Sequence, residues 1–164
     1  MNRQFNVTID PRKELYCFSF GYGDCYKLAT GRCTFELTEN EYQQEKAKCD
    51  SNYYNEARVG YCRELFEMMK DGGEYSATTP TGIDAHRNAC GHITLSQGQH
   101  RSCIAKKNQL QKLHIDVLSD NGDCLCSSCY LEKEEVQERK RFWHIFKRSK
   151  KNKAVSIYII DDKL

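Results

Sequence analysis

The sequence predicts a small α/β protein of the α+β type, folded as a single domain. At 164 residues the chain is long enough for one hydrophobic core and short for two. Its composition, with 39% apolar residues, 29% charged residues and two prolines, is that of a folded chain. Segments that alternate apolar and polar residues predict strands, and segments with apolar residues at i, i+3 and i+4 predict helices. We therefore expect strands and helices to share one core.

Two segments in the first 40 residues alternate in the manner of strands, at residues 4–9 and 32–37. The inward residues of the first are Phe5, Val7 and Ile9. The stretch between them, FGYGDCYKLATG, predicts a loop, because its G-x-G lacks the strand–GxGxxG–helix context of a phosphate loop. The N-terminal part therefore predicts two strands joined by a turn-rich connection.

Two helices are predicted next. The run from Thr38 to Glu41 matches a capping box, in which the Thr38 hydroxyl accepts from the third helical amide, so a helix begins there and runs to about Cys49. A second helix, from Glu56 to Lys70, has an apolar stripe interpreted as core. The stripe consists of Tyr61, Cys62, Leu65, Phe66 and Met69.

A strand, a helix and a strand follow a polar, turn-rich loop at residues 74–90. The first strand contains Ile93 and Leu95, the helix spans about residues 99–109, and the second strand contains the alternating residues of "LHIDVL". The inward helix residues are Cys103, Ile104 and Ala105, and those of the second strand are Leu113, Ile115 and Val117. This order predicts a compact crossover unit.

Polar side chains gather where this unit turns from strand to helix, in the sequence GQHR. A helix N-terminus exposes unpaired amides and a positive dipole end, and Gly98 lets the backbone approach a ligand closely. Arg101 could hold the same anion with its guanidinium, and Gln99 and His100 add donors. The alternative is a plain turn whose first helical residues face water.

The stretch 91–118 resembles the second conserved box of the ParB/sulfiredoxin-like superfamily, and GQHR is similar to its DGQHR-type branch. The resemblance implies a mixed sheet and a phosphate site at Gly98, Gln99, His100 and Arg101. It also implies a nucleotide, ATP or CTP with Mg²⁺, as ligand. Repair of oxidised cysteine is disfavoured, because Gln99 stands where sulfiredoxins have their reactive cysteine.

A catalytic step at this turn would need a general base beside the phosphate, with Arg101 and His100 stabilising the charge. Glu74, Asp84 and His86 are the candidates, because they lie in the loop leading to the strand. Ordinary solvated loop residues are the alternative interpretation. The predicted chemistry is hydrolysis of a nucleotide or transfer of phosphate.

Ten cysteines are present, and their interpretation depends on the compartment. The N-terminus lacks the apolar run of a signal peptide, and no stretch approaches the roughly 18 apolar residues of a membrane span, so we expect a cytoplasmic protein. In a reducing cytosol, clustered cysteines bind metal or lie in the core more often than they form disulfides.

One cysteine cluster, C-x-C-x-x-C, brings three soft ligands into six residues at Cys124, Cys126 and Cys129. Thiolates at this spacing predict a tetrahedral zinc site, with Cys90, Cys103 or His114 as fourth ligand. Reduced structural thiols, an iron–sulfur cluster and a redox pair of the last two cysteines remain alternatives.

The C-terminal part, residues 131–164, predicts a charged helix and a terminal strand packed on the domain formed by residues 1–130. The segment 139–153 holds eight Lys or Arg with interleaved aromatic residues, a pattern of nucleic-acid or anionic-surface contact. Its candidate nucleic-acid residues are Arg139, Arg141, Lys147 and Arg148. Four preceding glutamates partly neutralise it, which favours a solvated helix docked by its aromatic residues.

Two functions follow. The first is a nucleotide- or phosphate-binding ParB-like protein that acts at the GQHR turn. The second is a non-enzymatic module that binds nucleic acid or protein, with a structural zinc site and the basic helix as its contact surface. The formal net charge of +2 gives no overall attraction to nucleic acid, so any anion site is local.

Overall fold

The computed structural model describes residues 3–21, 23–48, 56–70, 80–121, 126, 129 and 157–160. Its elements are β1 (Gln4–Ile9), β2 (Leu15–Phe20), α1 (Tyr26–Thr30), the 3₁₀ helix η1 (Thr34–Glu36), α2 (Glu39–Lys48), α3 (Tyr61–Lys70), β3 (Asp84–Asn88), β4 (His92–Leu95), α4 (Gln99–Lys107), β5 (Leu113–Asn121) and β6 (Ile157–Ile160). This mixture of strands and helices confirms the α/β class.

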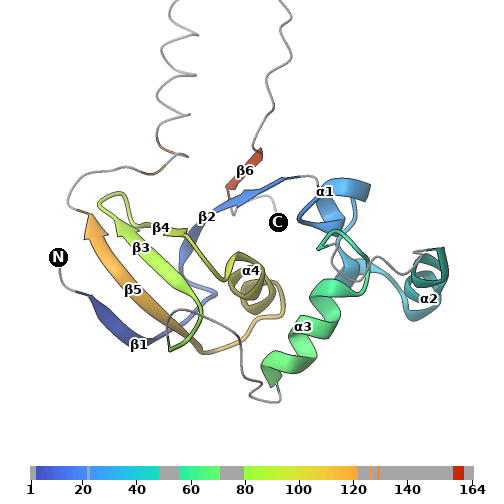
Figure 1. Cartoon of the computed structure of the whole chain (residues 1–164), viewed down its shortest axis with the longest axis horizontal. Coiled ribbons are helices and arrows are strands. Elements are labelled where there is room, and N and C mark those ends of the chain that lie inside the picture. Colours follow the sequence, from blue (N-terminus) through green and yellow to red (C-terminus); the bar gives the residue numbers. More distant parts are fainter. Residues whose placement is uncertain are drawn as a thin grey trace, which may run out of the picture.

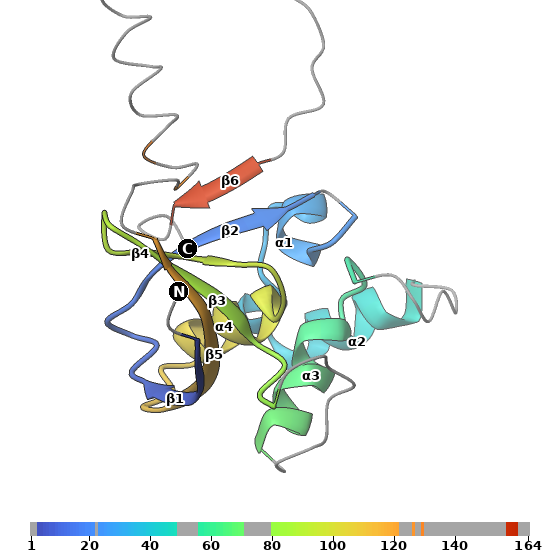
Figure 2. The same ribbon diagram turned by 60° about the vertical axis from the view of Figure 1, so that its left-hand side comes forward.

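The strands form one mixed six-stranded sheet in the order β1-β5-β3-β4-β2-β6 (Figure 1). The pairs β3–β5 and β2–β4 are parallel, and the other neighbours are antiparallel. Helix α4 lies beside the sheet, and α1, α2 and α3 gather beyond it (Figures 1 and 2). The mixed sheet agrees with the coarse architecture that the sequence predicted.

The core lies between the sheet and α4. Tyr16, Phe18, Ile93 and Ile115 from three strands are almost completely buried there, and Ala105 of α4 joins the same cluster. A second, smaller cluster lies around α1 and α2, and its members are Tyr26, Leu37, Tyr42 and Val59. The two clusters supply most of the apolar burial that stabilises the described part of the chain.

Strand β2 lies inside the sheet, between β4 and β6. The sequence pattern did not predict it, because Tyr16, Cys17 and Phe18 form a continuous buried run instead of an alternation. Continuous runs are typical of strands covered on both faces, and alternation is typical of strands covered on one.

The strand predicted at residues 32–37 is wrong, since η1 forms there. Glu36 makes two local hydrogen bonds: its amide donates to the Cys33 carbonyl at 2.9 Å, and its carboxylate accepts from the Cys33 amide at 3.2 Å. These bonds close a tight turn and leave the segment outside the sheet. In this turn Leu37 joins the second apolar cluster, and Cys33 and Phe35 line a small cavity.

Strand β1 has the predicted bounds, and Val7 and Ile9 face the core as predicted, but Phe5 does not. Asn6 adopts a positive φ of 54°, and the pairing with β5 is irregular between Gln4 and Val7. Phe5 is consequently 53% exposed, although its spacing from Val7 predicted an inward side chain. The irregularity is held by the Asn6 amide, which donates to Asp116 Oδ1 at 2.7 Å.

Part of the loop predicted at residues 74–90 is a central strand, β3. Its backbone pairs with both β4 and β5, so its polar side chains belong to the sheet. The unit that follows is also different from a parallel crossover. Because β4 is antiparallel to β3 and β5 is parallel to it, β4 and β5 run in opposite directions on the two sides of β3, joined by α4.

The capping box at the start of α2 is confirmed. The Glu41 amide donates to Thr38 Oγ1 at 3.4 Å, and the Glu41 carboxylate accepts from the Thr38 amide at 2.8 Å. Helix α3 ends at Lys70 as predicted but begins at Tyr61, because residues 56–60 form turns. Its apolar stripe is half-buried.

The C-terminal strand β6 pairs with β2 in antiparallel register, with Phe20 opposite Ile157 (Figure 2). The predicted charged helix lies outside the described residues, together with Arg139, Arg141, Lys147 and Arg148. Within the described ranges, no helix has the length and apolar character that a membrane crossing requires.

Candidate metal centre

The tip of the β3–β4 hairpin carries two potential metal ligands, Cys90 and His92. The connection is short, and the Gly91 amide donates to the Asn88 carbonyl at 2.8 Å. Gly91 has a φ of +87°, the left-handed conformation that commonly closes such hairpins. The Asn88 side-chain amide donates to the His92 carbonyl at 3.0 Å and to Thr94 Oγ1 at 2.7 Å, which fixes the two strand ends.

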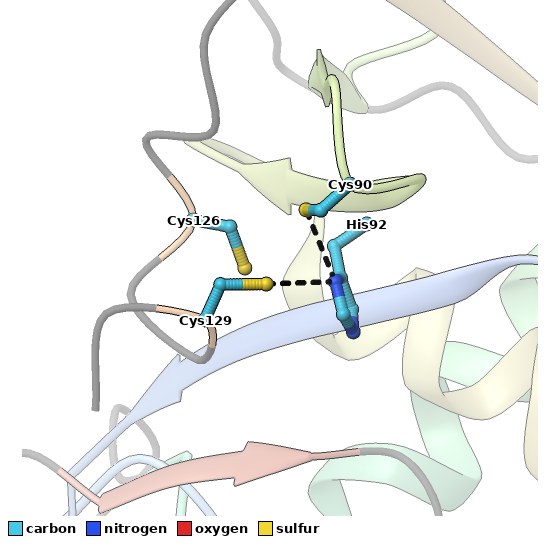
Figure 3. Close-up of side chains that lie close together, drawn as sticks. All are labelled: Cys90, His92, Cys126 and Cys129. Atoms are coloured by element: carbon cyan, nitrogen blue, oxygen red, sulfur yellow. Dashed lines mark hydrogen bonds between the residues drawn. The ribbon is translucent and has the colours of Figure 1, made fainter. Parts of the chain in front are cut away.

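Two further ligands, Cys126 and Cys129, approach this tip from a distant part of the chain (Figure 3). The Sγ atoms of Cys90 and Cys129 lie 3.2 Å and 3.7 Å from His92 Nδ1. The four ligand atoms all lie within 4.8 Å of one another. Cys126 is fully buried and the other three are half-buried.

These separations match the requirements of a single tetrahedral ion. With Zn–S of about 2.3 Å and Zn–N of about 2.0 Å, the edges of a tetrahedron are about 3.5–3.8 Å. The two distances to His92 Nδ1 lie close to this range, and three thiolates with one imidazole form a ligand set typical of structural zinc. A multi-iron cluster would hold thiolates that bind different irons further apart than this.

A fifth sulfur borders the site. Cys17 Sγ of β2 lies 3.4 Å from Cys126 Sγ, and both side chains are buried. Cys17 is not among the four atoms that lie within 4.8 Å of one another. It therefore packs the ligand segment against β2 beside the centre.

The structure brings together three of the four cysteines predicted as metal ligands: Cys90, Cys126 and Cys129. Cys124 lies outside the described residues. His92 was not predicted, although the pair of short spacings C-x-H and C-x-x-C was visible in the sequence. The two alternative fourth ligands lie elsewhere. Cys103 is on α4, and His114 is exposed on β5, where its Nδ1 lies 3.3 Å from Thr8 Oγ1.

The Gly98 turn is shaped by packing. Gly98 has a φ of +81° and precedes α4, which has no side-chain cap and no acidic residue in its first turn. A Cβ at this position would lie 2.7 Å from Ile83 Cγ1 and 2.9 Å from Ile83 Cα. The close approach that glycine permits here is therefore to the Ile83 backbone.

The polar side chains of the GQHR sequence contact backbone groups of the protein. Gln99 Oε1 accepts from the Ser19 amide at 2.5 Å, and His100 Nε2 donates to the Asp24 carbonyl at 2.6 Å. The Arg101 guanidinium is buried and donates to the carbonyls of Thr81, at 3.1 Å, and Gly82. Each of these bonds ties the start of α4 to another part of the chain.

Arg101 also lines a cavity with a volume of about 330 Å³. Two more basic side chains, Lys112 and His114, line this cavity, and so does Thr81. Gly98, Gln99 and His100 do not line it. The arginine and the Gly98 turn, which the sequence predicted to hold one anion together, therefore face different spaces.

The three predicted general bases are placed as follows. Glu74 lies outside the described residues. Asp84 is buried at the start of β3, where its amide donates to the Gln97 carbonyl at 3.2 Å, next to the Gly98 turn. His86, on β3, has Nδ1 at 2.7 Å from Ser119 Oγ and Nε2 at 3.3 Å from Ser96 Oγ. Both described residues are therefore strand residues, and the prediction that they lie in a loop is wrong.

Comparison of the chain with models of protein families, with curated proteins and with solved structures found no match. The function is therefore inferred from the geometry of the sites.

The environment of His100 predicts a loss of stability in mild acid. Its ring packs against Phe20 and Tyr61, and burial lowers the pKa of His100 below the usual value of 6.5. The unfolded chain then binds a proton more readily than the folded chain. Stability is therefore full above about pH 6.5 and falls as the pH drops below it. His100→Gln keeps a donor for the Asp24 carbonyl and does not titrate, so we expect a smaller loss.

The measurement is the urea midpoint of unfolding at pH 7.5 and pH 5.5. An equal loss in His100→Gln and wild type would show that His100 does not contribute.

Proposed function

We propose that the protein binds one Zn²⁺ at Cys90, His92, Cys126 and Cys129, and that the ion fastens two distant parts of the chain. The observation that carries this proposal is the convergence of four ligand atoms within 4.8 Å of one another from two segments far apart in sequence. Four protein ligands complete a tetrahedron and leave no open position for a substrate or water. The role of the metal is therefore structural.

A structural zinc at this position supports a binding module. The centre would hold the segment at Cys126 and Cys129 against the β3–β4 hairpin, and this segment leads into residues 131–149, where the sequence predicts a charged helix. Zinc binding would therefore fix the position, relative to the domain, of the chain segment that leads into the predicted helix. Contact of its basic residues with nucleic acid or protein, and the ParB/sulfiredoxin-like fold, stay predictions.

Metal analysis of the purified chain tests the zinc proposal. We expect about one zinc per chain in the wild type, and loss of zinc in His92→Ala and Cys129→Ser. His114→Ala and Cys17→Ser are matched controls, because they change a histidine and a thiol outside the four-ligand set, and both should keep the metal. Substitution by Co²⁺ should give the absorption of a tetrahedral thiolate site. A wild type that binds no zinc, or controls that lose it, would contradict the proposal.

A second function is favoured by the cavity beside Arg101. We propose that it binds a phosphorylated small molecule, with a nucleotide as the first candidate. A volume of about 330 Å³ is adequate for a small ligand, and Arg101, Lys112 and His114 provide a basic lining. Thr81 adds a hydroxyl. This proposal retains the predicted role of Arg101 and moves the anion from the first turn of α4 to the cavity.

Titration of ¹⁵N-labelled protein with ATP, CTP and inorganic phosphate, with and without Mg²⁺, tests this second function. Saturable shifts of the amide resonances of Thr81 and Leu113 mark the cavity, and shifts of Gln99 and His100 mark the first turn of α4. Lys112→Ala should weaken binding at least several-fold, and Lys13→Ala, which changes an exposed lysine outside the cavity, should not. Shifts confined to residues 99–100 would place the ligand at the turn, and no shifts would contradict both sites.

A further inference from the structure

The thiol of Cys17 contacts the proposed zinc centre without being one of its four ligands. Its Sγ lies 3.4 Å from Sγ of Cys126, which is a proposed ligand, and both side chains are buried. A disulfide has an S–S distance of about 2.05 Å, so the two sulfurs touch but are not bonded. A movement of about 1.4 Å would join them.

The backbone of Cys17 is held firmly inside the sheet. Strand β2 lies between β4 and β6, and Cys17 stands opposite Thr94 on one side and Ile160 on the other. Cys126 lies 109 residues further along the chain, beyond the end of β5. A bond between the two sulfurs would therefore attach the segment that carries Cys126 to the sheet without any metal.

We propose that Cys17 and Cys126 form a redox switch, in which a peroxide joins them in a disulfide and the zinc is released. This inference rests on the proposed zinc centre. Metals bind the thiolate form of cysteine, and a sulfur that shares a disulfide bond is no longer a thiolate. Oxidation would leave Cys90, His92 and Cys129, which cannot complete a tetrahedron by themselves.

The chemistry uses one hydrogen peroxide for each disulfide. Zinc-bound Cys126 is a thiolate, and its sulfur attacks one peroxide oxygen. The O–O bond breaks, hydroxide leaves, and Cys126 becomes a sulfenic acid that no longer binds zinc. The Cys17 thiol then attacks this sulfur, the S–S bond forms, and the sulfenic oxygen leaves as water with the Cys17 proton. The two sulfurs lose two electrons in total, and one proton from solvent converts the hydroxide into the second water.

The burial of the two sulfurs requires a small oxidant. Cys17 and Cys126 are buried, whereas Cys90, His92 and Cys129 are half-buried and mark the side from which peroxide would reach the centre. Cys129 competes as the partner of Cys126, because their Sγ atoms lie within 4.8 Å of each other. The 3.4 Å contact favours Cys17.

Treatment of the zinc-loaded full chain with hydrogen peroxide tests the switch. We expect release of about one zinc per chain, followed with a chromogenic zinc chelator. Mass spectrometry of a digest under non-reducing conditions should show two peptides joined through residues 17 and 126. Dithiothreitol and fresh zinc should restore the metal content, because added thiolate exchanges with the disulfide.

Cys17→Ser separates the switch from the zinc centre. This variant should bind zinc as the wild type does, since residue 17 is outside the four-ligand set. In peroxide it should release zinc at least several-fold more slowly and form no linked peptide, because the nearest thiol to Cys126 is gone. Cys103→Ser, which changes a cysteine of α4, is the matched control and should behave as the wild type.

The two proposals can fail separately. A loaded wild type in which peroxide links Cys126 to Cys129, or a Cys17→Ser variant that releases zinc as fast as the wild type, would overturn the switch and leave the zinc centre standing. A wild type that binds no zinc would contradict the centre and the switch together. The linked peptide is identified in the wild type, so a variant that fails to fold does not affect that result.

Discussion

Removal of zinc from the Cys90–His92–Cys126–Cys129 centre is expected to lower the melting temperature by about 8–16 °C. An ion present at about 1,000 times its dissociation constant stabilises the folded state by about 4 kcal/mol. For a chain of this size, about 1 kcal/mol corresponds to about 2–4 °C in melting temperature. The measurement is thermal unfolding with and without a zinc chelator.

The large effect follows from the position of the centre. It joins the tip of the β3–β4 hairpin to a segment that begins beyond the end of β5, so the ion closes a long loop of chain. Cys129→Ser is the control, since a chain that no longer binds zinc should be unaffected by the chelator. An unchanged wild-type melting temperature, or an equal decrease in Cys129→Ser, would contradict a stabilising zinc.

Gly98→Ala is expected to destabilise the fold by about 2–5 kcal/mol. The left-handed conformation of residue 98, with a φ of +81°, costs a residue with a Cβ about 1–2 kcal/mol. The added methyl group would also lie 2.7–3.0 Å from three atoms of Ile83, and overpacking of this kind costs about 1–3 kcal/mol. Ile83 cannot easily move away, because its carbonyl accepts a hydrogen bond from the Asp116 amide at 2.8 Å. Urea unfolding measures the change.

Gly31→Ala separates the two contributions. Gly31 has nearly the same φ, +86°, but a Cβ there would have no atom within 4 Å. We expect this variant to lose only about 1–2 kcal/mol, the backbone part alone. An equal loss of unfolding free energy in Gly98→Ala and Gly31→Ala would show that the contact with Ile83 does not contribute to the effect.

Elements whose signals are local were predicted from the sequence. The capping box at Thr38 and Glu41 needs only residues three apart, and α2 begins where it indicates. The segments of β4, α4 and β5 were recognised from their periodicity. Elements whose environment decides their form were missed. Strand β2 is buried on both faces, and residues 32–37 satisfy their own hydrogen bonds in a turn.

The candidate sites divide in the same way. The spacing of Cys126 and Cys129 is a local pattern, and it predicted a metal ligand pair. The choice of partners depends on which strand tip lies next to that pair, and the hairpin supplies Cys90 together with His92. The roles of Gln99, His100 and Arg101 were likewise invisible in the sequence, because the backbone carbonyls and amide that they contact lie about 20–80 residues away.

The sequence by itself determined the class of the fold, the start of α2, the glycine turn before α4 and the presence of a thiol pair suited to zinc. These depend on propensities and on contacts between near neighbours in the chain. Only the tertiary structure decided that β3 is a central strand, that His92 joins the metal centre, and that Cys25, Cys33, Cys62 and Cys103 share one cavity. Those outcomes depend on which distant segments pack together, and packing is set by the whole sheet and its helices instead of by any short stretch.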